Sequence, residues 1–184
     1  MLEIENTVLV MVDMQARLVP AMHEADRLVT EMARLLSAAN LLEVPLIFTE
    51  QNPDGLGPTV DELAGLTHGK PIAKHAFSCW REPAFEKALV GRRRSAVLLA
   101  GIESHVCIFQ TALDLCEAGF EVHVASDAVS SRTDSNRQVG LNRCAATGAI
   151  ITSVESALFE LLQAAGANCP AGADTFKEIL KIIK

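Results

Sequence analysis

The sequence predicts a three-layer α/β/α fold, in which a parallel β-sheet lies between two layers of helices. Six short apolar runs alternate along the chain with longer stretches whose apolar residues recur at helical spacing. Most of the short runs are almost continuously apolar, as is typical of strands buried on both faces. Parallel neighbours in a sheet need crossover connections, and the helical stretches between the runs supply them.

The expected strands follow from the apolar runs, of which the third (PIAK) is the weakest because it is so short. They cover residues 7–13, 45–50, 71–74, 95–102, 121–127 and 149–153. We expect the strand order 3-2-1-4-5-6, which reverses between strands one and four. This is a Rossmann-type arrangement.

The expected helices cover residues 24–42, 83–90, 104–118, 134–147, 155–165 and 175–183. Gly119 and Gly148 each fall where a helix should end, just before a strand. The segment QNPDGLGPT (51–59) is rich in turn-forming residues and follows the second strand. We expect it to be irregular and to form the rim of a pocket.

Composition limits the classes of function. A length of 184 residues suits one domain covering 1–184, and the formal net charge of -7 argues against a nucleic-acid partner. No run approaches the roughly 20 apolar residues needed to span a membrane. The N-terminal MLEIENT lacks a cationic leader, and five cysteines do not suggest a disulfide framework. We therefore expect a cytoplasmic protein with reduced thiols.

Three reactive side chains stand at expected strand ends. Asp13 ends the first strand, Lys74 ends the third, and Cys107 follows the fourth where a helix begins. Ligands of open α/β sheets bind beyond the carboxyl ends of the strands, at the point where the strand order reverses. We expect the three side chains to meet there.

Together these residues form a set with a chemical purpose. A helix N-terminus and the Lys74 ammonium both favour a thiolate at Cys107, while Asp13 can accept and return a proton. Each residue also has a plain structural interpretation: Asp13 as a turn cap, Lys74 as a solvated cation and Cys107 as a packing residue. The combination favours the functional interpretation.

These residues lie within motifs that resemble a known family. The chain is similar to the isochorismatase-like cysteine hydrolases, and within them to the small single-domain isochorismatase-domain-containing proteins. The resemblance runs from about Asn6 to Leu162. It rests on VLVMVDMQ, TEQNPDGLGPT, KHAFSCW, GIESHVCIFQTALDL and EVHVASDAVSSRT.

The resemblance assigns roles to residues of this chain. Asp13 would be the general base and acid, Lys74 the electrostatic partner and Cys107 the nucleophile. A cis peptide between Ile102 and Glu103 is implied as well. The amides of Glu103 and Cys107 would then face a developing oxyanion. Family members often assemble, so we expect a homo-oligomer.

Metal binding is not expected. The nicotinamidase branch of the family holds a divalent ion through histidines in the region after strand two, where this chain has none. His68 and His75 are isolated and lack the spacing of metal ligands. We also do not expect His105 to pair with Cys107, because side chains two residues apart in a helical turn point in different directions. No cofactor is implied.

Four further residues are candidate substrate contacts. Gln15, Phe77 and Trp80 follow the triad positions closely, and Leu56 lies on the proposed rim. Ordinary packing explains Phe77 and Trp80 equally well.

The leading hypothesis is a metal-independent cysteine hydrolase that cleaves a C–N bond of a small amide or carbamoyl compound through a thioester. One alternative is vinyl ether hydrolysis of the isochorismatase type, which needs an acid but no thiol nucleophile. The other is a small-molecule binder or oligomeric scaffold without turnover.

Overall fold

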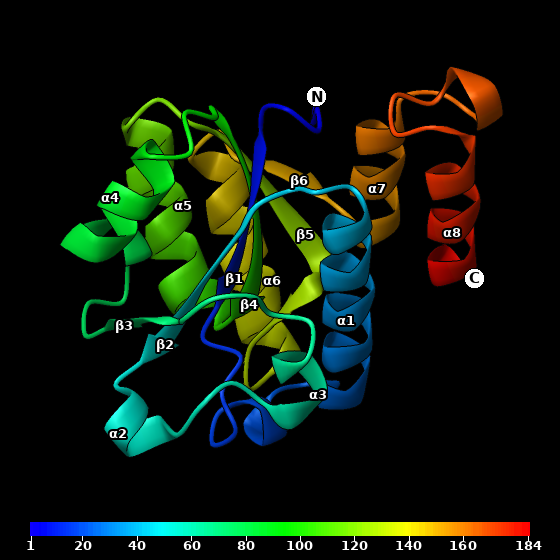
Figure 1. The fold of residues 1–184 in the computed structure, drawn as a ribbon. Coiled ribbons are helices and arrows are strands. Elements are labelled where there is room, and N and C mark those ends of the chain that lie inside the picture. Colours follow the sequence, from blue (N-terminus) through cyan, green and yellow to red (C-terminus); the bar gives the residue numbers. More distant parts are fainter.

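The computed structural model describes residues 1–184 and contains one six-stranded parallel sheet. Its strand order is β3-β2-β1-β4-β5-β6, which confirms the predicted order and its reversal between β1 and β4. Helices cover both faces of the sheet (Figure 1). The three-layer α/β/α prediction is therefore confirmed.

The strands lie close to their predicted positions. Their bounds are β1 (Thr7–Val12), β2 (Leu46–Gln51), β3 (Ile72–Lys74), β4 (Ala96–Ile102), β5 (Glu121–Ser130) and β6 (Ile150–Thr152). Strand β1 pairs with β2 on one side and β4 on the other, so it occupies the middle of the sheet. Every residue of β1 and β4 is buried, as near-continuous apolar sequence requires.

The helices form two layers. Helices α1 (Ala25–Leu41), α7 (Val154–Leu162) and α8 (Ala173–Ile183) contribute buried residues to one apolar cluster. Helices α4 (Pro83–Val90), α5 (Phe109–Glu117) and α6 (Asp134–Ala146) contribute to the cluster on the opposite face. Short helical turns complete the chain: η1 (Val19–Ala21), α2 (Pro53–Leu56), α3 (Asp61–Ala64), η2 (Cys79–Arg81), η3 (Ser104–Ile108) and η4 (Gly166–Asn168).

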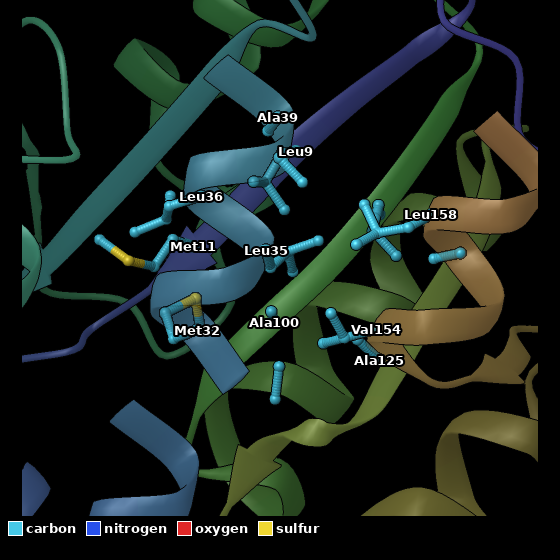
Figure 2. Close-up of a cluster of buried hydrophobic side chains, with 14 of the residues drawn as sticks. Leu9, Met11, Met32, Leu35, Leu36, Ala39, Ala100, Ala125, Val154 and Leu158 are labelled. Carbon is cyan, nitrogen blue, oxygen red and sulfur yellow. The ribbon is translucent and has the colours of Figure 1, made fainter. Parts of the chain in front are cut away.

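The two apolar clusters arise from the alternation of side chains along each strand. Leu9 and Met11 of β1 point toward α1, where they meet Leu35 and its neighbours (Figure 2). Val8 and Val10 point to the other face and join the cluster under α4, α5 and α6. Because both faces of β1 are covered, its polar side chains are confined to its ends, with Thr7 at the start and Asp13 just past the last residue.

Strand β5 is longer than predicted, because it continues past an irregularity to Ser130. Its pairing with β4 shifts register between Leu99 and Gly101, so the residues before Val129 are bulged out of the ladder. The bulge places the carboxylate of Asp127 where it accepts a 2.8 Å hydrogen bond from the backbone N–H of Val154. The sequence pattern shows the apolar run but not this bulge.

The helix after β4 also differs from prediction. The sequence predicts one α-helix over 104–118, but the segment begins as a π-helical turn, η3, before α5 starts at Phe109. The segment 51–59, expected to be irregular, contains the short helix α2. A single extra residue per turn leaves no clear trace in apolar spacing, so the π-helical turn does not follow from the sequence pattern. Helix α2 has four residues, which is too few for helical spacing to indicate it.

Two glycines permit close contacts near the reversal point. Gly101 has a φ of 119°, and a Cβ atom there would overlap the backbone of Val12 in β1. Gly140 of α6 lies against the backbone of Ser104 and His105, where a Cβ atom would overlap as well. Helix α6 therefore packs directly on the backbone of the π-helical turn.

Gly140→Ala is expected to destabilise the protein although alanine favours helices. The added methyl group must displace η3, and overpacking of this kind costs about 1–3 kcal/mol. We expect the Tm to fall by several degrees in a thermal melt. Gly65→Ala is the control, because its Cβ would meet no atom within 4 Å. A variant at Gly140 as stable as the parent would contradict this packing.

Candidate active site

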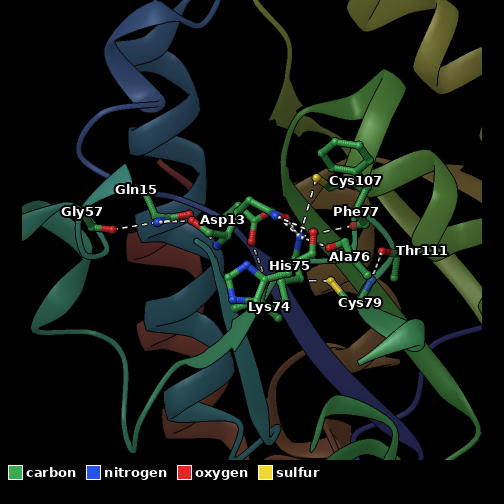
Figure 3. A network of polar contacts seen from close by, with 12 residues as sticks. Asp13, Gln15, Gly57, Lys74, His75, Ala76, Phe77, Cys79, Cys107 and Thr111 are labelled. Atoms are coloured by element: carbon green, nitrogen blue, oxygen red, sulfur yellow. Dashed lines mark hydrogen bonds and ion pairs between the residues drawn. The ribbon is translucent and has the colours of Figure 1, made fainter. Parts of the chain in front are cut away.

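Asp13, Lys74 and Cys107 meet at the carboxyl edge of the sheet. Asp13 follows the last residue of β1, Lys74 is the last residue of β3, and Cys107 lies in η3 just after β4 (Figure 3). Strand β2 separates β3 from β1, so the long lysine side chain must reach across it. Residues far apart in sequence are thus brought together by strand order alone.

Asp13 and Lys74 form a buried ion pair. The Oδ2 atom of Asp13 lies 2.7 Å from Nζ of Lys74, and both side chains are almost fully excluded from solvent. The other carboxylate oxygen of Asp13 accepts a 2.8 Å hydrogen bond from the hydroxyl of Thr49. Each carboxylate oxygen thus has one close polar neighbour, although Oδ2 has the ion pair alone and no hydrogen bond of good geometry.

The ammonium group of Lys74 has more acceptors than hydrogens. Besides Asp13, Nζ donates to Oε1 of Gln51 at 2.6 Å and approaches two backbone carbonyls, of Ala76 and Phe77, at 3.2 Å each. The sulfur of Cys107 is a fifth neighbour at 3.7 Å. An ammonium carries three hydrogens, so the last of them is shared between weaker partners. That hydrogen can turn toward the sulfur when negative charge develops there.

Charge within the site stabilises the lysine as a cation. Burial alone would lower the pKa of Lys74, but the negative charge of Asp13, with that of Cys79 and Cys107 when they ionise, outweighs it and raises the pKa. Lys74 is therefore an ammonium, and the ion pair has no net charge.

Cys107 is a neutral thiol in the resting protein. Burial and then the negative charge of Asp13 raise the pKa of Cys107 to about 12, although Lys74 acts to lower it. Lys74 acts in the expected direction, but burial and Asp13 outweigh it, so the net effect of the site is to favour the thiol and not the expected thiolate. The side chain is 7% exposed, so the sulfur lies just beneath the surface.

The peptide bond between Ile102 and Glu103 is cis. It joins the end of β4 to η3, directly ahead of the turn that carries Cys107. The carboxylate of Glu103 accepts from the backbone N–H of Arg132 at 3.3 Å and lies 3.5 Å from its guanidinium. This contact joins the start of η3 to the chain that follows β5.

Gln15 and Leu56 lie on the rim formed by segment 51–59. The side chain of Gln15 is buried and donates to the carbonyls of Gln51 and Gly57 at 3.0 and 2.7 Å. Its oxygen accepts from the backbone N–H of Gln51 at 2.8 Å. Gln15 therefore fastens the rim to the end of β2, and Leu56 lies half-buried in α2 of that rim.

Phe77 and Trp80 lie on the segment after Lys74 but differ in their surroundings. Phe77 is 53% exposed, and its backbone carbonyl contacts Nζ of Lys74. Trp80 is half-buried and packs edge-on against Phe120, with ring centroids 5.5 Å apart. Phe77 thus has a ring free for a ligand beside the site, whereas one side of Trp80 is occupied.

Three residues at the site were not singled out in the sequence. Thr49 and Gln51 at the end of β2 contact Asp13 and Lys74 respectively. Thr111 of α5 accepts a 2.9 Å hydrogen bond from the backbone N–H of Cys79. Thr49 is the first polar residue of the second strand, which was the available signal for it, and the position of Gln51 directly after the predicted strand was the signal for Gln51.

His105 is directed away from the thiol and toward the end of β5. Its Nδ1 atom lies 3.0 Å from the hydroxyl of Ser131, which in turn is 2.7 Å from the hydroxyl of Ser104. Ser131, directly after β5, therefore anchors η3.

No group of three or more His, Cys, Asp or Glu side chains is arranged to hold a metal ion. None of the helices combines the length and apolar character needed to cross a membrane.

The fold and motifs can now be compared with known proteins. The model of the isochorismatase domain matches residues 7–156. Isochorismatase domain-containing protein 2A of Mus musculus is 42% identical over 98% of this chain and 84% of its own length. The secreted isochorismatase effector Isc1 of Phytophthora sojae is 46% identical over 82% of this chain and 71% of its own length. Since one relative is secreted, the cytoplasmic location stays a prediction.

Solved structures of similar fold include three relevant examples. The MAR1 ribonuclease from Caenorhabditis elegans superposes with a TM-score of 0.89 at 36% identity, covering 99% of this chain and 91% of the other. YcaC from Pseudomonas aeruginosa, with hexane-2,5-diol and covalent acrylamide, gives 0.90 at 25% identity, with 98% and 90% covered. YcaC from Escherichia coli, an octameric hydrolase of unknown specificity, gives 0.85 at 27% identity, with 89% and 82% covered.

The matched domain covers most of the chain, and the mouse relative is 42% identical over 98% of this chain. The fold is the hydrolase fold of that family. The chain therefore belongs to the isochorismatase domain family.

Proposed function

We propose that this protein is a metal-independent cysteine hydrolase that cleaves a C–N bond of a small amide or carbamoyl compound. The observation that carries the proposal is the contact of the Lys74 ammonium with both Asp13 and Cys107. A carboxylate, a cation and a thiol within reach of one another supply a base, a charge partner and a nucleophile.

The first step begins from a neutral thiol. As the sulfur of Cys107 attacks the substrate carbonyl, Asp13 takes the thiol proton and Lys74 turns its shared hydrogen toward the sulfur. A C–S bond forms, and the carbonyl oxygen becomes an oxyanion held by the backbone amides of Glu103 and Cys107. Proton transfer occurs during attack, because the raised pKa of Cys107 leaves very little thiolate at neutral pH.

The later steps return the site to its starting state. Asp13 gives its proton to the departing amine as the C–N bond breaks, which leaves a thioester or thiocarbamate on Cys107. A water molecule then attacks that carbonyl and passes a proton to Asp13. The thiol leaves with that proton, and an acid or carbamate is released.

Comparison with relatives gives this proposal further support. The P. aeruginosa neighbour is described with covalent acrylamide, an electrophile of the kind that a reactive nucleophile attacks. The E. coli neighbour is described as an octameric hydrolase. We extend the assembly to this chain as a homo-oligomer acting on a small molecule. Gln15 and Leu56 would shape the substrate rim, while Phe77 and Trp80 would supply aromatic contacts.

A ribonuclease is the second candidate, since the C. elegans neighbour carries that name at 36% identity. A net charge of -7 opposes binding to a polyanion. Cleavage of single-stranded RNA that disappears in Asp13→Asn would favour this candidate over the amidase.

The first test is a panel of small amides, ureas and carbamates examined for product and for mass shifts on the intact protein. We expect at least one compound to be turned over and to leave an acyl or carbamoyl mass on Cys107. Cys107→Ala should lose both signals, because Cys107 is the thiol hydrogen-bonded to Lys74 and the other nearby thiol, of Cys79, is fully buried. Cys116→Ala, which changes a half-buried cysteine of α5, should retain them.

The panel also decides between the remaining hypotheses. Turnover retained in Cys107→Ala would support vinyl ether hydrolysis or another route that needs no thiol. If the panel gave no product and no mass shift, the result would support a binder or scaffold.

Asp13→Asn should change turnover and alkylation in opposite directions. Loss of a general base lowers turnover by about 10²–10⁴-fold. The negative charge of Asp13 raises the pKa of Cys107, so its removal lowers that pKa and increases the thiolate present at a fixed pH. One pKa unit is tenfold in thiolate, so iodoacetamide should label Cys107 several-fold faster at pH 8.

Asp54→Asn, on the exposed rim, is the control and should change neither rate. If Asp13→Asn slowed alkylation as much as turnover, the carboxylate would promote the thiolate instead of opposing it. The proposed coupling of attack and proton transfer would then be wrong.

A further inference from the structure

The chain immediately after Lys74 wraps around its ammonium group. We call residues 75–81 the lysine loop. Two carbonyls of this loop, of Ala76 and Phe77, accept from Nζ at 3.2 Å, so the loop and the lysine head share one position. The loop therefore contributes two of the contacts that hold Nζ near Cys107, beside those of Asp13 and Gln51.

Helix α5 and the turn before it fix the other side of the lysine loop. Cys107, Thr111 and Asp114 stand on successive turns of this one helical run, spaced four and three residues apart. The buried hydroxyl of Thr111 accepts from the backbone N–H of Cys79 at 2.9 Å. The same helical run therefore presents the candidate nucleophile and an anchor for the loop that holds its cation.

A second anchor closes the far end of the loop. The carboxylate of Asp114 binds Arg81 through Nε at 2.8 Å and Nη2 at 3.2 Å. The guanidinium is largely exposed, so this pair is screened by solvent and contributes less than a buried contact. Thr111 is fully buried, and without its hydroxyl the N–H of Cys79 would have no partner.

We propose that Thr111 is a positioning residue of the active site, which holds the lysine loop so that the Lys74 ammonium stays in contact with the Cys107 sulfur. Asp114 supports the same loop through Arg81. The inference rests on the proposed function for its importance to catalysis, but it concerns the distance between two groups and needs no substrate to be tested. The hydroxyl of Thr111, on the helical run that carries the thiol, thereby helps to fix the position of the Lys74 ammonium.

The competing interpretation is that Thr111 only stabilises the fold. A buried hydrogen bond stabilises a protein wherever it lies, so a lower Tm in a Thr111 variant does not separate the two interpretations. Coupling to Lys74 does separate them. If Thr111 acts through Lys74, its removal has no further effect on Cys107 once the ammonium is gone.

The experiment measures the rate at which iodoacetamide labels Cys107 at pH 9, followed by peptide mass mapping. Thr111→Val keeps the shape of the side chain and removes the acceptor, whereas Thr111→Ser keeps the hydroxyl. Both are made in the parent chain and in Lys74→Met. Thr30→Val is the matched control, because the hydroxyl of Thr30 bonds within the exposed face of α1.

We expect Thr111→Val to slow labelling in the parent chain by about threefold to tenfold, because a loosened Lys74 supports less thiolate. Thr111→Ser should stay within about twofold of the parent, and Thr30→Val should not differ. In Lys74→Met the Thr111→Val change should have no effect. If Thr111→Val folds poorly, Asp114→Asn takes its place, because it loosens the same loop at a solvent-exposed contact. Asp114→Asn should slow labelling less than Thr111→Val.

Equal slowing by Thr111→Val with and without Lys74 would overturn the proposal, as would faster labelling in both backgrounds. The first result would mean a general structural role, and the second would mean that the loop merely shields the thiol. Failure of the hydrolase proposal looks different, because the panel would then give no turnover while the coupling between Thr111 and Lys74 persisted.

Discussion

The buried ion pair between Asp13 and Lys74 determines how this edge of the molecule is built. Two charges lie almost without solvent contact 2.7 Å apart, and removing one partner from such a pair costs about 3–5 kcal/mol. The surroundings must therefore satisfy both groups. Thr49 donates to the carboxylate, while Gln51 and the carbonyls of residues 76 and 77 accept from the ammonium. The ends of β1, β2 and β3 are in this way tied to one another by a single charge pair.

The same pair defines the chemistry available to Cys107. Burial and the carboxylate hold the pKa of the thiol near 12, so the site does not store a thiolate in advance. The ammonium has more acceptors than hydrogens, so it strengthens its hydrogen bond to the sulfur only as negative charge forms there. In the proposed mechanism, such a site reacts only when a carbonyl is in place to be attacked. The same mechanism implies slow alkylation and oxidation of Cys107 without substrate, because those reactions need the thiolate.

The sequence could predict the topology and the three central residues because these depend on coarse patterns. Apolar runs located the strands, and the rule that parallel strands end at one edge brought Asp13, Lys74 and Cys107 together. The protonation state of the thiol could not be predicted, since it depends on burial and on the distance to Asp13. Nor could the bulge of β5, the π-helical turn or the role of Thr111, because each depends on which backbone atoms meet in three dimensions. Polar residues such as Thr49 and Gln51 at strand ends gave a signal that residue type alone did not make specific.

The most direct measurement is a crystal structure of the protein after reaction with an electrophilic amide. We predict that the adduct is attached to Sγ of Cys107, that Nζ of Lys74 lies within contact of that sulfur and of Asp13, and that the amide oxygen faces the backbone N–H groups of Glu103 and Cys107. Attachment at another cysteine, or an unmodified Cys107 with Lys74 directed away from it, would contradict the account.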